Sequence, residues 1–309
     1  MYKQGKAVHP GDTLGIVGPS STLGNHSLEQ GLAVLHALGY KTKLGKSATA
    51  HWGYLAGDDA LRAQDITDMF ADDSVDGIIC LRGGYGATRL LPLLDYQTIA
   101  AHPKLFVGFS DITALHTVFL QRCRFMPVHG TMVMSLGRDA SAYTKTCLAK
   151  GLGNPYQPGK IPLPADWHME SIVPGDVTGT ICGGNLMLLA ATTGTPYALQ
   201  IEDAILLIEE IGEEAYSLDR MLCQLEEAGI IARARGIIFG EFTRCEPNEP
   251  APYEFTSREI VYQYAKRWGK PAVWGFPAGH GTDNTWLPLG MKARLCCQAD
   301  DPYVELLPW

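Results

Sequence analysis

The chain has 309 residues, of which 46% are hydrophobic and 19% are charged, and its formal net charge is −8. At roughly 150 residues per domain, this length predicts about two domains, each with a sizeable core. The charge is spread along the chain without a basic patch, which argues against nucleic-acid binding. No stretch approaches the roughly 18 consecutive apolar residues of a membrane span. The first residues lack the apolar region of a signal peptide.

The cysteines and histidines also limit the possible chemistry. Eight cysteines are scattered along the chain without C-x-x-C spacing. We therefore expect reduced thiols in a cytoplasmic protein. No cluster of His and Cys has the spacing of zinc ligands, so we expect no metal site and no cofactor.

The first half of the chain alternates apolar, strand-like runs with segments of helical periodicity. The expected strands are 13–17, 40–44, 77–81 and 105–109, and the expected helices are 27–38, 58–70 and 87–94. This alternation predicts an α/β domain with a mostly parallel sheet covered on both faces. In such sheets the functional loops gather at the carboxyl ends of the strands. Three loops have that position: 18–21, 82–86 and the corner at Ser110.

The second half continues the pattern after a stretch without it. Residues 150–175 are rich in Gly and Pro, and we expect a linker there between domains 1–149 and 176–309. Strands are expected at 176–182, 204–208, 236–239 and 271–275, and helices from 186 and at 218–228 and 258–268. The tail, 292–307, resembles two antiparallel strands.

The corner at Ser110 is the most informative segment. An apolar strand precedes it, Gly108 permits a tight bend, and apolar residues at helical spacing follow it. A serine at such a corner has its hydroxyl lifted clear of the sheet, beside the first N–H groups of a helix. This geometry exposes a weak nucleophile and places backbone N–H groups beside it that can bind an oxyanion. The simpler alternative, which this segment alone favours, is that Ser110 or Asp111 caps the helix.

A serine nucleophile needs a base, and the base needs an orienting carboxylate. His280 is flanked by glycines and follows a strand-like run, although an ordinary loop histidine would look the same. His129 is a weaker rival for the base, and His116 is expected to pack or face solvent on its helix. Glu209 ends an apolar strand, which places it at the carboxyl edge of the sheet. A solvated acidic loop over 209–214 is the alternative.

The loop 82–86, Arg-Gly-Gly-Tyr-Gly, directly follows a strand. It meets neither the G-x-G-x-x-G pattern nor the lysine-bearing P-loop pattern, so a phosphate cradle is not indicated. Its backbone could instead donate to an oxyanion, with Gly84 the better candidate. Arg82 could hold a substrate carboxylate through a bidentate pair. A plain tight turn is the alternative.

Five short blocks occur in order along nearly the whole chain. They are 81–87, 108–114, 183–186, 209–213 with 219–222, and 279–281. Each block alone is weak, but together, at comparable spacing, they resemble the L,D-carboxypeptidases, peptidase family S66. The resemblance implies a Rossmann- or flavodoxin-like N-terminal domain and a smaller C-terminal α/β domain, often as a homodimer.

The resemblance also implies roles for individual residues. Ser110 matches the nucleophile, Glu209 the triad carboxylate and His280 the general base, while the backbone N–H groups of Gly84 and Asp111 match the oxyanion hole. Many relatives carry Asp after the triad glutamate, where this chain has Glu210, which makes Glu210 the second choice for the carboxylate.

The activity implied is serine peptidase cleavage of an L,D-amide bond. It releases the C-terminal D-alanine from cytoplasmic murein tetrapeptides during peptidoglycan recycling. The expected partner is a muropeptide, with no nucleic acid and no membrane. The substrate-binding positions are Arg82, Gly83, Tyr85 and Asn185.

Three other functions remain open. Microcin-immunity relatives use the same triad to cleave a peptidyl-nucleotide amide, and Tyr85, Trp52 and Trp286 could provide an aromatic shelf for the base. A binding module for wall fragments with an inactive triad is disfavoured because all three triad residue types are present. A nucleotide-dependent enzyme is disfavoured by the missing phosphate motifs.

Overall fold

The computed structural model describes residues 2–138, 140–246, 253–298 and 300–308. The chain forms two compact units, one of Met1–Tyr156 with Asn284–Gly290 and one of Gln157–Asp283 with Met291–Trp309. The segment Asn284–Gly290 belongs to the first unit because its strand β12 (Leu287–Pro288) pairs antiparallel with β5 (Val128–His129). Within the described ranges, no helix has the length and apolar character needed to cross a membrane.

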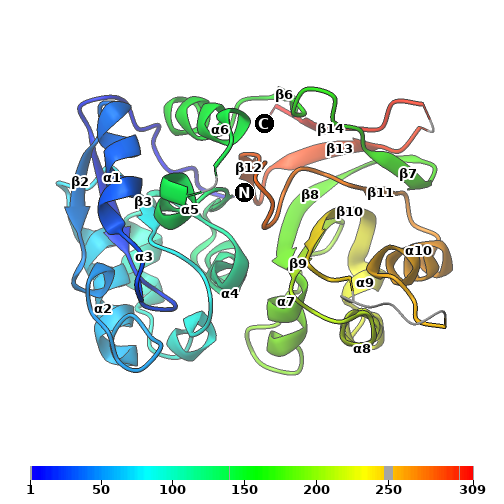
Figure 1. Cartoon of the computed structure of the whole chain (residues 1–309), viewed down its shortest axis with the longest axis horizontal. Helices are drawn as coiled ribbons and strands as arrows, with labels where there is room; N and C mark the ends of the chain where they lie inside the picture. Colours follow the sequence, from blue (N-terminus) through cyan, green and yellow to red (C-terminus); the bar gives the residue numbers. More distant parts are fainter. Residues whose placement is uncertain (1, 139, 247–252, 299, 309) are drawn as a thin grey trace. The chain divides into compact units, whose positions relative to one another are not determined.

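A six-stranded sheet forms the centre of the first unit (Figure 1). Its strands, besides β5 and β12, are β1 (Thr13–Val17), β2 (Lys41–Leu44), β3 (Gly77–Cys80) and β4 (Leu105–Gly108). The strand order is β12-β5-β4-β3-β1-β2, and β1 to β5 run parallel. The order 2-1-3-4-5 is that of flavodoxin-like folds, in which ligands bind at the carboxyl ends of the strands. The expected α/β fold is confirmed.

Short helices connect these strands. They are α1 (Leu28–Ala37), η1 (Lys46–Ala48), α2 (Asp59–Ala71), η2 (Ala87–Leu90), α3 (Tyr96–Ala101), η3 (Ser110–Ile112), α4 (Thr113–Val118), η4 (Phe119–Cys123), α5 (Val133–Arg138) and α6 (Ala142–Gly153). Helix α1 packs on α5, and α2 packs on α3. The helix expected over 87–94 is only the 3₁₀ turn η2, because Pro92 has no N–H with which to continue it.

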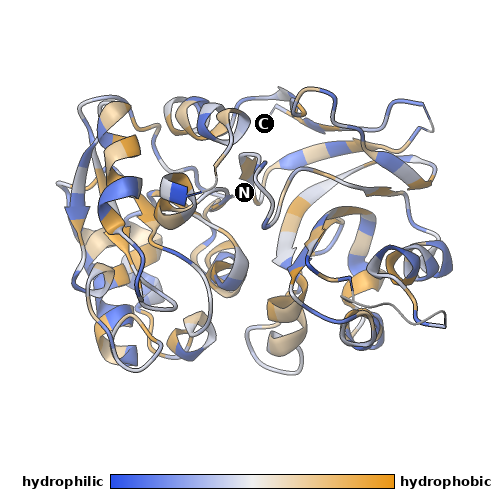
Figure 2. Ribbon diagram, viewed as in Figure 1, coloured by the Kyte–Doolittle hydropathy of each residue, from blue (hydrophilic) through white to orange (hydrophobic). Residues whose placement is uncertain are grey.

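Apolar side chains fill the space between sheet and helices, and Figure 2 shows the central strands of this unit as hydrophobic. Phe70, Phe106, Phe119 and Phe125 are fully buried and form one aromatic cluster. Phe106 meets Phe119 edge-on, with ring centroids 5.0 Å apart. Because Phe106 lies on β4, this cluster anchors the strand that leads to Ser110.

An eight-stranded sheet forms the second unit, in the order β6-β14-β13-β8-β9-β10-β11-β7. Its strands are β6 (Gly159–Lys160), β7 (Glu170–Val173), β8 (Asp176–Asn185), β9 (Ala204–Ile211), β10 (Ala234–Thr243), β11 (Ala272–Trp274), β13 (Lys292–Cys296) and β14 (Tyr303–Leu306). The central strands β8 to β11 are parallel, and the outer strands are antiparallel. The antiparallel pair expected over 292–307 is confirmed.

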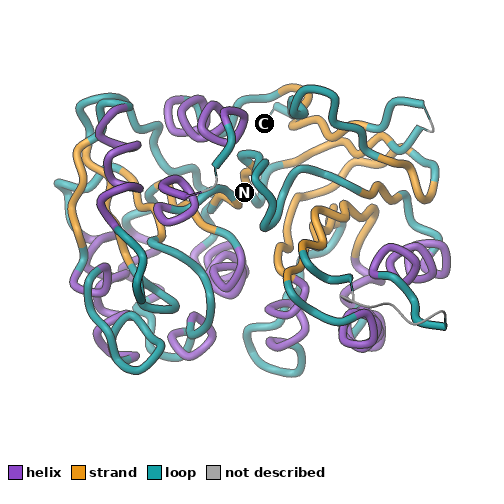
Figure 3. The backbone as a smooth tube through the Cα atoms, in the orientation of Figure 1, coloured by secondary structure: helices purple, strands orange, loops and turns teal. Residues whose placement is uncertain are grey.

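Four helices belong to this sheet: α7 (Leu186–Thr192), α8 (Ala215–Glu227), α9 (Ile230–Arg233) and α10 (Ser257–Trp268). Figure 3 shows them gathered on one side of the strands. The stretch 150–175, expected as a linker, contains the end of α6 and the strands β6 and β7. These two strands are short and lie at the two edges of the sheet, so they lack the alternating pattern by which a strand is recognised.

Candidate active site

Ser110 lies directly beyond the carboxyl end of β4, at a sharp backbone corner. Its φ is +64°, in the left-handed region that costs an L residue roughly 1–2 kcal/mol. The turn η3 begins at Ser110 itself, and helix α4 follows from Thr113. A strained serine between a parallel strand and a helix is the geometry of a nucleophile elbow.

Gly108 permits the tight bend at this corner through its missing Cβ, as the sequence predicts. The left-handed conformation itself is at Ser110. A Cβ at Gly108 would lie 2.8 Å from Cγ2 of Ile112, inside van der Waals contact. The glycine therefore lets the turn after Ser110 fold closely back over the end of β4.

The loop after β3 lies against this corner. A Cβ placed on Gly83 would be 2.9 Å from Ser110 Cβ, 3.0 Å from Ser110 Oγ and 3.4 Å from the Asp111 amide nitrogen. Because residue 83 has no side chain, the space that its Cβ would fill, 3.0 Å from a hydroxyl and 3.4 Å from a backbone N–H, is not occupied by residue 83 itself. A carbonyl undergoing attack needs such a position.

Other residues of this loop are held by the loop after β1. Gly84 has φ +112°, and a Cβ there would overlap Oγ of Ser21. That same hydroxyl accepts a hydrogen bond from the Tyr85 N–H at 3.1 Å. Arg82 donates from Nη1 to the Thr22 carbonyl at 3.2 Å. Burial lowers the pKa of Arg82, and the nearby charge of Arg138 lowers it further.

The carboxylate of Asp111 joins three loops below the corner. It is buried and accepts hydrogen bonds from Ser20 Oγ at 2.6 Å and from the Ala87 N–H at 2.8 Å. Burial raises the pKa of Asp111, while these two bonds and the charge of Arg62 oppose the increase. The family resemblance implies a role for the backbone N–H of Asp111. The structure shows in addition that its side chain connects neighbouring loops through hydrogen bonds.

Arg62, on α2, is the second connection between these loops, and sequence reasoning missed it. Its side chain is fully buried and donates to the carbonyls of Gly57, Pro19 and Gly86. It also pairs with Asp59. No local pattern distinguishes Arg62 from the solvated charges of an amphipathic helix, because its acceptors come from separate loops.

In the second unit, Glu209 and His280 form a hydrogen-bonded pair. Glu209 Oε2 lies 2.8 Å from His280 Nδ1. The Glu209 side chain is completely buried, and the His280 side chain is 13% exposed. Burial lowers the pKa of His280, but the charge and hydrogen bond of Glu209, together with Glu210 and Glu241, raise it overall. A general base oriented by a carboxylate has this arrangement.

Glu210 has a different environment from Glu209. Its carboxylate accepts from Asn185 Nδ2 at 2.8 Å, from the Met187 N–H at 2.7 Å and from the Ile211 N–H at 2.8 Å. Burial, with the charge of Glu209, raises the pKa of Glu210 to about 7. Glu209, and not Glu210, forms the hydrogen bond to His280 Nδ1. Burial of both residues excludes the solvated acidic loop as the explanation for this pair.

Asn185, one of the predicted substrate-binding residues, is also engaged within the unit. Besides its bond to Glu210, its Oδ1 accepts the Leu188 N–H at 3.3 Å and so caps α7. Two glycines precede it in β8, and a Cβ on Gly183 would overlap the Leu207 carbonyl of β9. The Gly-Gly-Asn block thus brings β8 close to the strand that carries Glu209.

The rival histidines lie in the core of the first unit. The His116 ring meets Phe106 edge-on, and burial holds the pKa of His116 well below its usual value. His116 has no hydrogen-bond partner among the described residues. His129 is fully buried on β5, with its ring 5.7 Å from that of Phe109.

The aromatic residues considered for a shelf differ in exposure. Trp286 covers Gly151 on α6 and donates to the carbonyl of Pro155, just beyond the end of that helix, at 3.0 Å. Trp52 and Tyr85 are about half exposed, at 54% and 49%. The Tyr85 ring lies 5.8 Å from that of Tyr54. Trp52 and Tyr85 thus have exposed surface, whereas Trp286 serves mainly as packing.

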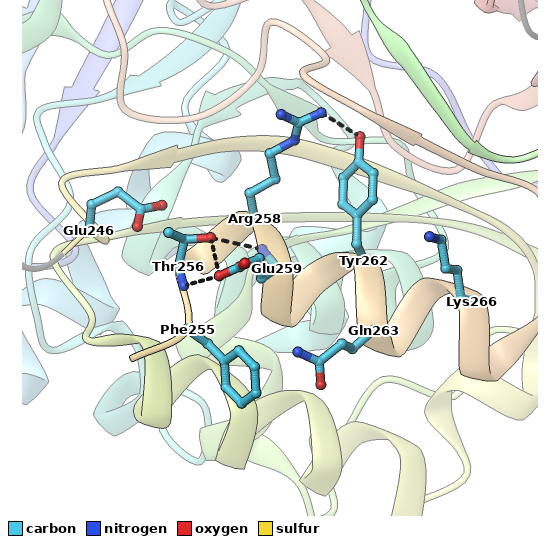
Figure 4. A pocket seen from close by; sticks show the side chains of 8 residues that line it. All are labelled: Glu246, Phe255, Thr256, Arg258, Glu259, Tyr262, Gln263 and Lys266. Carbon is cyan, nitrogen blue, oxygen red and sulfur yellow. Dashed lines mark hydrogen bonds between the residues drawn. The ribbon is translucent and has the colours of Figure 1, made fainter. Parts of the chain in front are cut away.

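A surface groove runs along α10 in the second unit (Figure 4). Its polar groups already have local roles, since Thr256 and Glu259 form the capping box of the helix. None of the predicted site residues lines it. Elsewhere in the described ranges, no three His, Cys, Asp or Glu side chains are grouped so as to hold a metal ion.

Comparison with known proteins connects both units to one family. Residues 14–130 match the LD-carboxypeptidase N-terminal domain and residues 178–295 the C-terminal domain of peptidase family S66. The probable murein peptide carboxypeptidase of Bacillus subtilis is 36% identical over 94% of this chain and 90% of its own length. The murein tetrapeptide carboxypeptidase of Pseudomonas aeruginosa is 33% identical, over 91% and 92%.

Two solved structures have the same fold. The muramoyltetrapeptide carboxypeptidase of Oxalobacter formigenes is 30% identical, with a TM-score of 0.84 over 96% of this chain and 99% of that one. The microcin C7 self immunity protein MccF has a TM-score of 0.90 over 99% and 98%, at 22% identity, which supports the fold alone. The resemblance of the sequence blocks is confirmed, and the chain belongs to the LD-carboxypeptidases of peptidase family S66.

Proposed function

We propose that this protein is a serine L,D-carboxypeptidase that releases the C-terminal D-alanine from murein tetrapeptides. One observation carries the proposal most directly. Gly83 leaves a position about 3 Å from Ser110 Oγ and 3.4 Å from the Asp111 amide nitrogen. The names of the relatives at 36% and 33% identity support a murein peptide as substrate.

Ser110 and His280 carry the proposed reaction. His280 Nε2 takes the Ser110 proton as Oγ attacks the carbonyl carbon before D-alanine. The resulting oxyanion accepts from the N–H groups of Gly84 and Asp111, each worth roughly 3–4 kcal/mol in comparable sites. His280 then protonates the leaving amine, D-alanine departs, and water hydrolyses the serine ester. Glu209, bonded to Nδ1, stabilises the imidazolium in both halves of the reaction.

A carboxypeptidase must also bind the free carboxylate of its substrate. We propose Arg82 for this role, with Gly83 and Tyr85 of the same loop contacting the peptide. Burial lowers the pKa of Arg82, but a guanidinium keeps its charge at neutral pH. Asn185 stays a prediction as a substrate contact, since its amide already bonds Glu210 and caps α7.

The alternative is cleavage of a peptidyl-nucleotide amide by the same triad. The partial exposure of Trp52 and Tyr85 favours it, because a nucleobase stacks on accessible aromatic rings. The packed position of Trp286 removes one member of the predicted shelf. The two substrates should be assayed side by side. Faster cleavage of the nucleotide-linked amide would overturn the murein assignment.

Mass spectrometry of a defined tetrapeptide tests reaction and direction together. We expect the loss of one C-terminal alanine and no internal cleavage. Ser110→Ala should lower kcat by several orders of magnitude, as should His280→Ala. Ser27→Ala, at an exposed serine before α1, is the control and should retain wild-type turnover. Full turnover by Ser110→Ala would exclude this mechanism.

A cytoplasmic location and assembly as a homodimer stay predictions from the sequence and the family resemblance. Sedimentation of the purified chain would test the dimer. Fractionation of cells that express it would test the location.

A further inference from the structure

A third carboxylate, Glu241, lies beside the Glu209–His280 pair and has no role in the reaction described above. It is on β10, where the pairing with β9 is irregular. Phe239 pairs with Ile208, but Phe242 pairs with Glu210, so β10 contains one extra residue opposite Glu209. A bulge of this kind redirects a side chain out of the regular alternation, and bulges are frequent beside active sites.

The bulged segment holds the loop that carries His280. The Phe276 N–H donates to the Phe239 carbonyl at 3.1 Å, and the Glu241 N–H donates to the Ala278 carbonyl at 2.9 Å. The Gly281 N–H then donates to Glu241 Oε2 at 2.6 Å. Backbone bonds thus fix the loop before His280, and the Glu241 carboxylate fixes it immediately after.

The glycines on both sides of His280 fit this carboxylate. A Cβ on Gly281 would overlap the Glu241 carboxylate, and one on Gly279 would lie 3.2 Å from both Glu241 Cβ and Glu209 Oε2. Gly240, in the bulge itself, has no room for a Cβ because the Ala278 carbonyl occupies the space. The Gly-His-Gly motif therefore reflects close packing of the histidine loop around two carboxylates.

Among the described residues, the charges that act most strongly on the two groups are acidic, apart from His280 itself. His280 is influenced by Glu209, Glu210 and Glu241, and Glu241 is influenced by Asp283, Glu209 and His280. Burial, opposed by the Gly281 bond, raises the pKa of Glu241 to about 7. In its ionised form Glu241 stabilises a protonated His280.

We propose that Glu241 is a positioning residue for His280, which holds the histidine loop through the Gly281 N–H and favours the imidazolium through its charge. This inference rests on the proposed function of His280 as the general base. Glu241 itself exchanges no proton with the substrate in this proposal.

The experiment compares Glu241→Ala and Glu241→Gln with Glu227→Gln, an exposed carboxylate on α8. Alanine removes the acceptor of the Gly281 N–H, so kcat should fall about tenfold or more while KM changes by less than about threefold. Glutamine keeps an acceptor oxygen but loses the charge, so the loss of kcat should be smaller. The pKa of the acid limb of kcat/KM should move down by about half a unit or more.

NMR titration of the His280 ring provides a readout that does not depend on turnover, with the resonance assigned by its absence in His280→Ala. Its pKa should be lower in Glu241→Gln than in the wild type and unchanged in Glu227→Gln. If both Glu241 variants match Glu227→Gln in kcat, acid limb and ring pKa, the inference is wrong. If Ser110→Ala stays active, the proposed function fails, and the ring pKa still decides whether Glu241 controls His280.

Discussion

The Asp111 side chain provides the sharpest test of how the nucleophile corner is built. Replacing Asp111 with alanine leaves the backbone N–H in place but removes the acceptor of two buried donors, Ser20 Oγ and the Ala87 N–H. The loops that carry Ser20 and Ala87 then lose their connection to the turn after Ser110. We therefore expect a loss of both stability and activity.

The magnitude of the stability loss follows from the two bonds. Hydrogen bonds to a charged group contribute about 1.5–3 kcal/mol each, so two contribute about 3–6 kcal/mol. Burial of Asp111, which raises its pKa, offsets part of this sum. We expect Asp111→Ala to lower the free energy of unfolding by about 3–4 kcal/mol. Both donors bind the same oxygen, Oδ2, so the carbonyl oxygen of Asp111→Asn can accept both bonds. This variant loses only the charge of the acceptor and should lose about half as much stability.

Urea denaturation measures the effect, with Asp95→Ala as the matched control. Asp95 also accepts from two backbone N–H groups and a hydroxyl, but it is an exposed cap of α3. Its removal should therefore cost only about 1 kcal/mol. A loss for Asp111→Ala no larger than that for Asp95→Ala would refute the argument that the buried carboxylate holds the loops together.

Three further predictions follow from single positions. Ser110→Gly and Ser110→Ala should both be inactive. In urea denaturation the glycine variant should be more stable than the alanine variant by about 0.5–1 kcal/mol, because φ at residue 110 is +64° and glycine adopts this conformation without strain. Equal stability of the two variants would contradict the strained corner. Gly83→Ala should lower kcat on a tetrapeptide at least about tenfold by crowding Ser110, whereas Gly153→Ala, with open space around it, should not. The pKa of Glu210 is about 7 in the folded protein and 4.5 for the free group, so folding favours its protonated form. The stability that this group contributes is therefore complete below about pH 4.5 and is lost as the pH rises through 7. The Tm of Glu210→Gln relative to the wild type should therefore rise over that window, and a constant difference would count against the raised pKa.

The strands, helices and tight turns of this protein can be predicted from its sequence, because they depend mainly on residues that are neighbours along the chain. Alternation of apolar runs with helical periodicity predicts the parallel sheets. The apolar run before Glu209 predicts a place near the carboxyl end of a strand, although β9 continues beyond Glu209 to Ile211. The strand–serine–helix pattern predicts the corner at Ser110. The two edge strands within 150–175 escape prediction because their pairing, rather than their composition, makes them strands.

Tertiary structure alone decides which side chains meet. The bond between Glu209 and His280 joins residues 71 positions apart, and that between Ser20 and Asp111 joins residues 91 apart. The buried position of Arg62 and the bulge at Glu241 arise from how strands and loops pack, and neither has a local signature. The sequence by itself thus determines the elements and the chemistry that their ends can offer. Only folding determines the partners, because these contacts depend on strand order and register rather than on neighbouring residues.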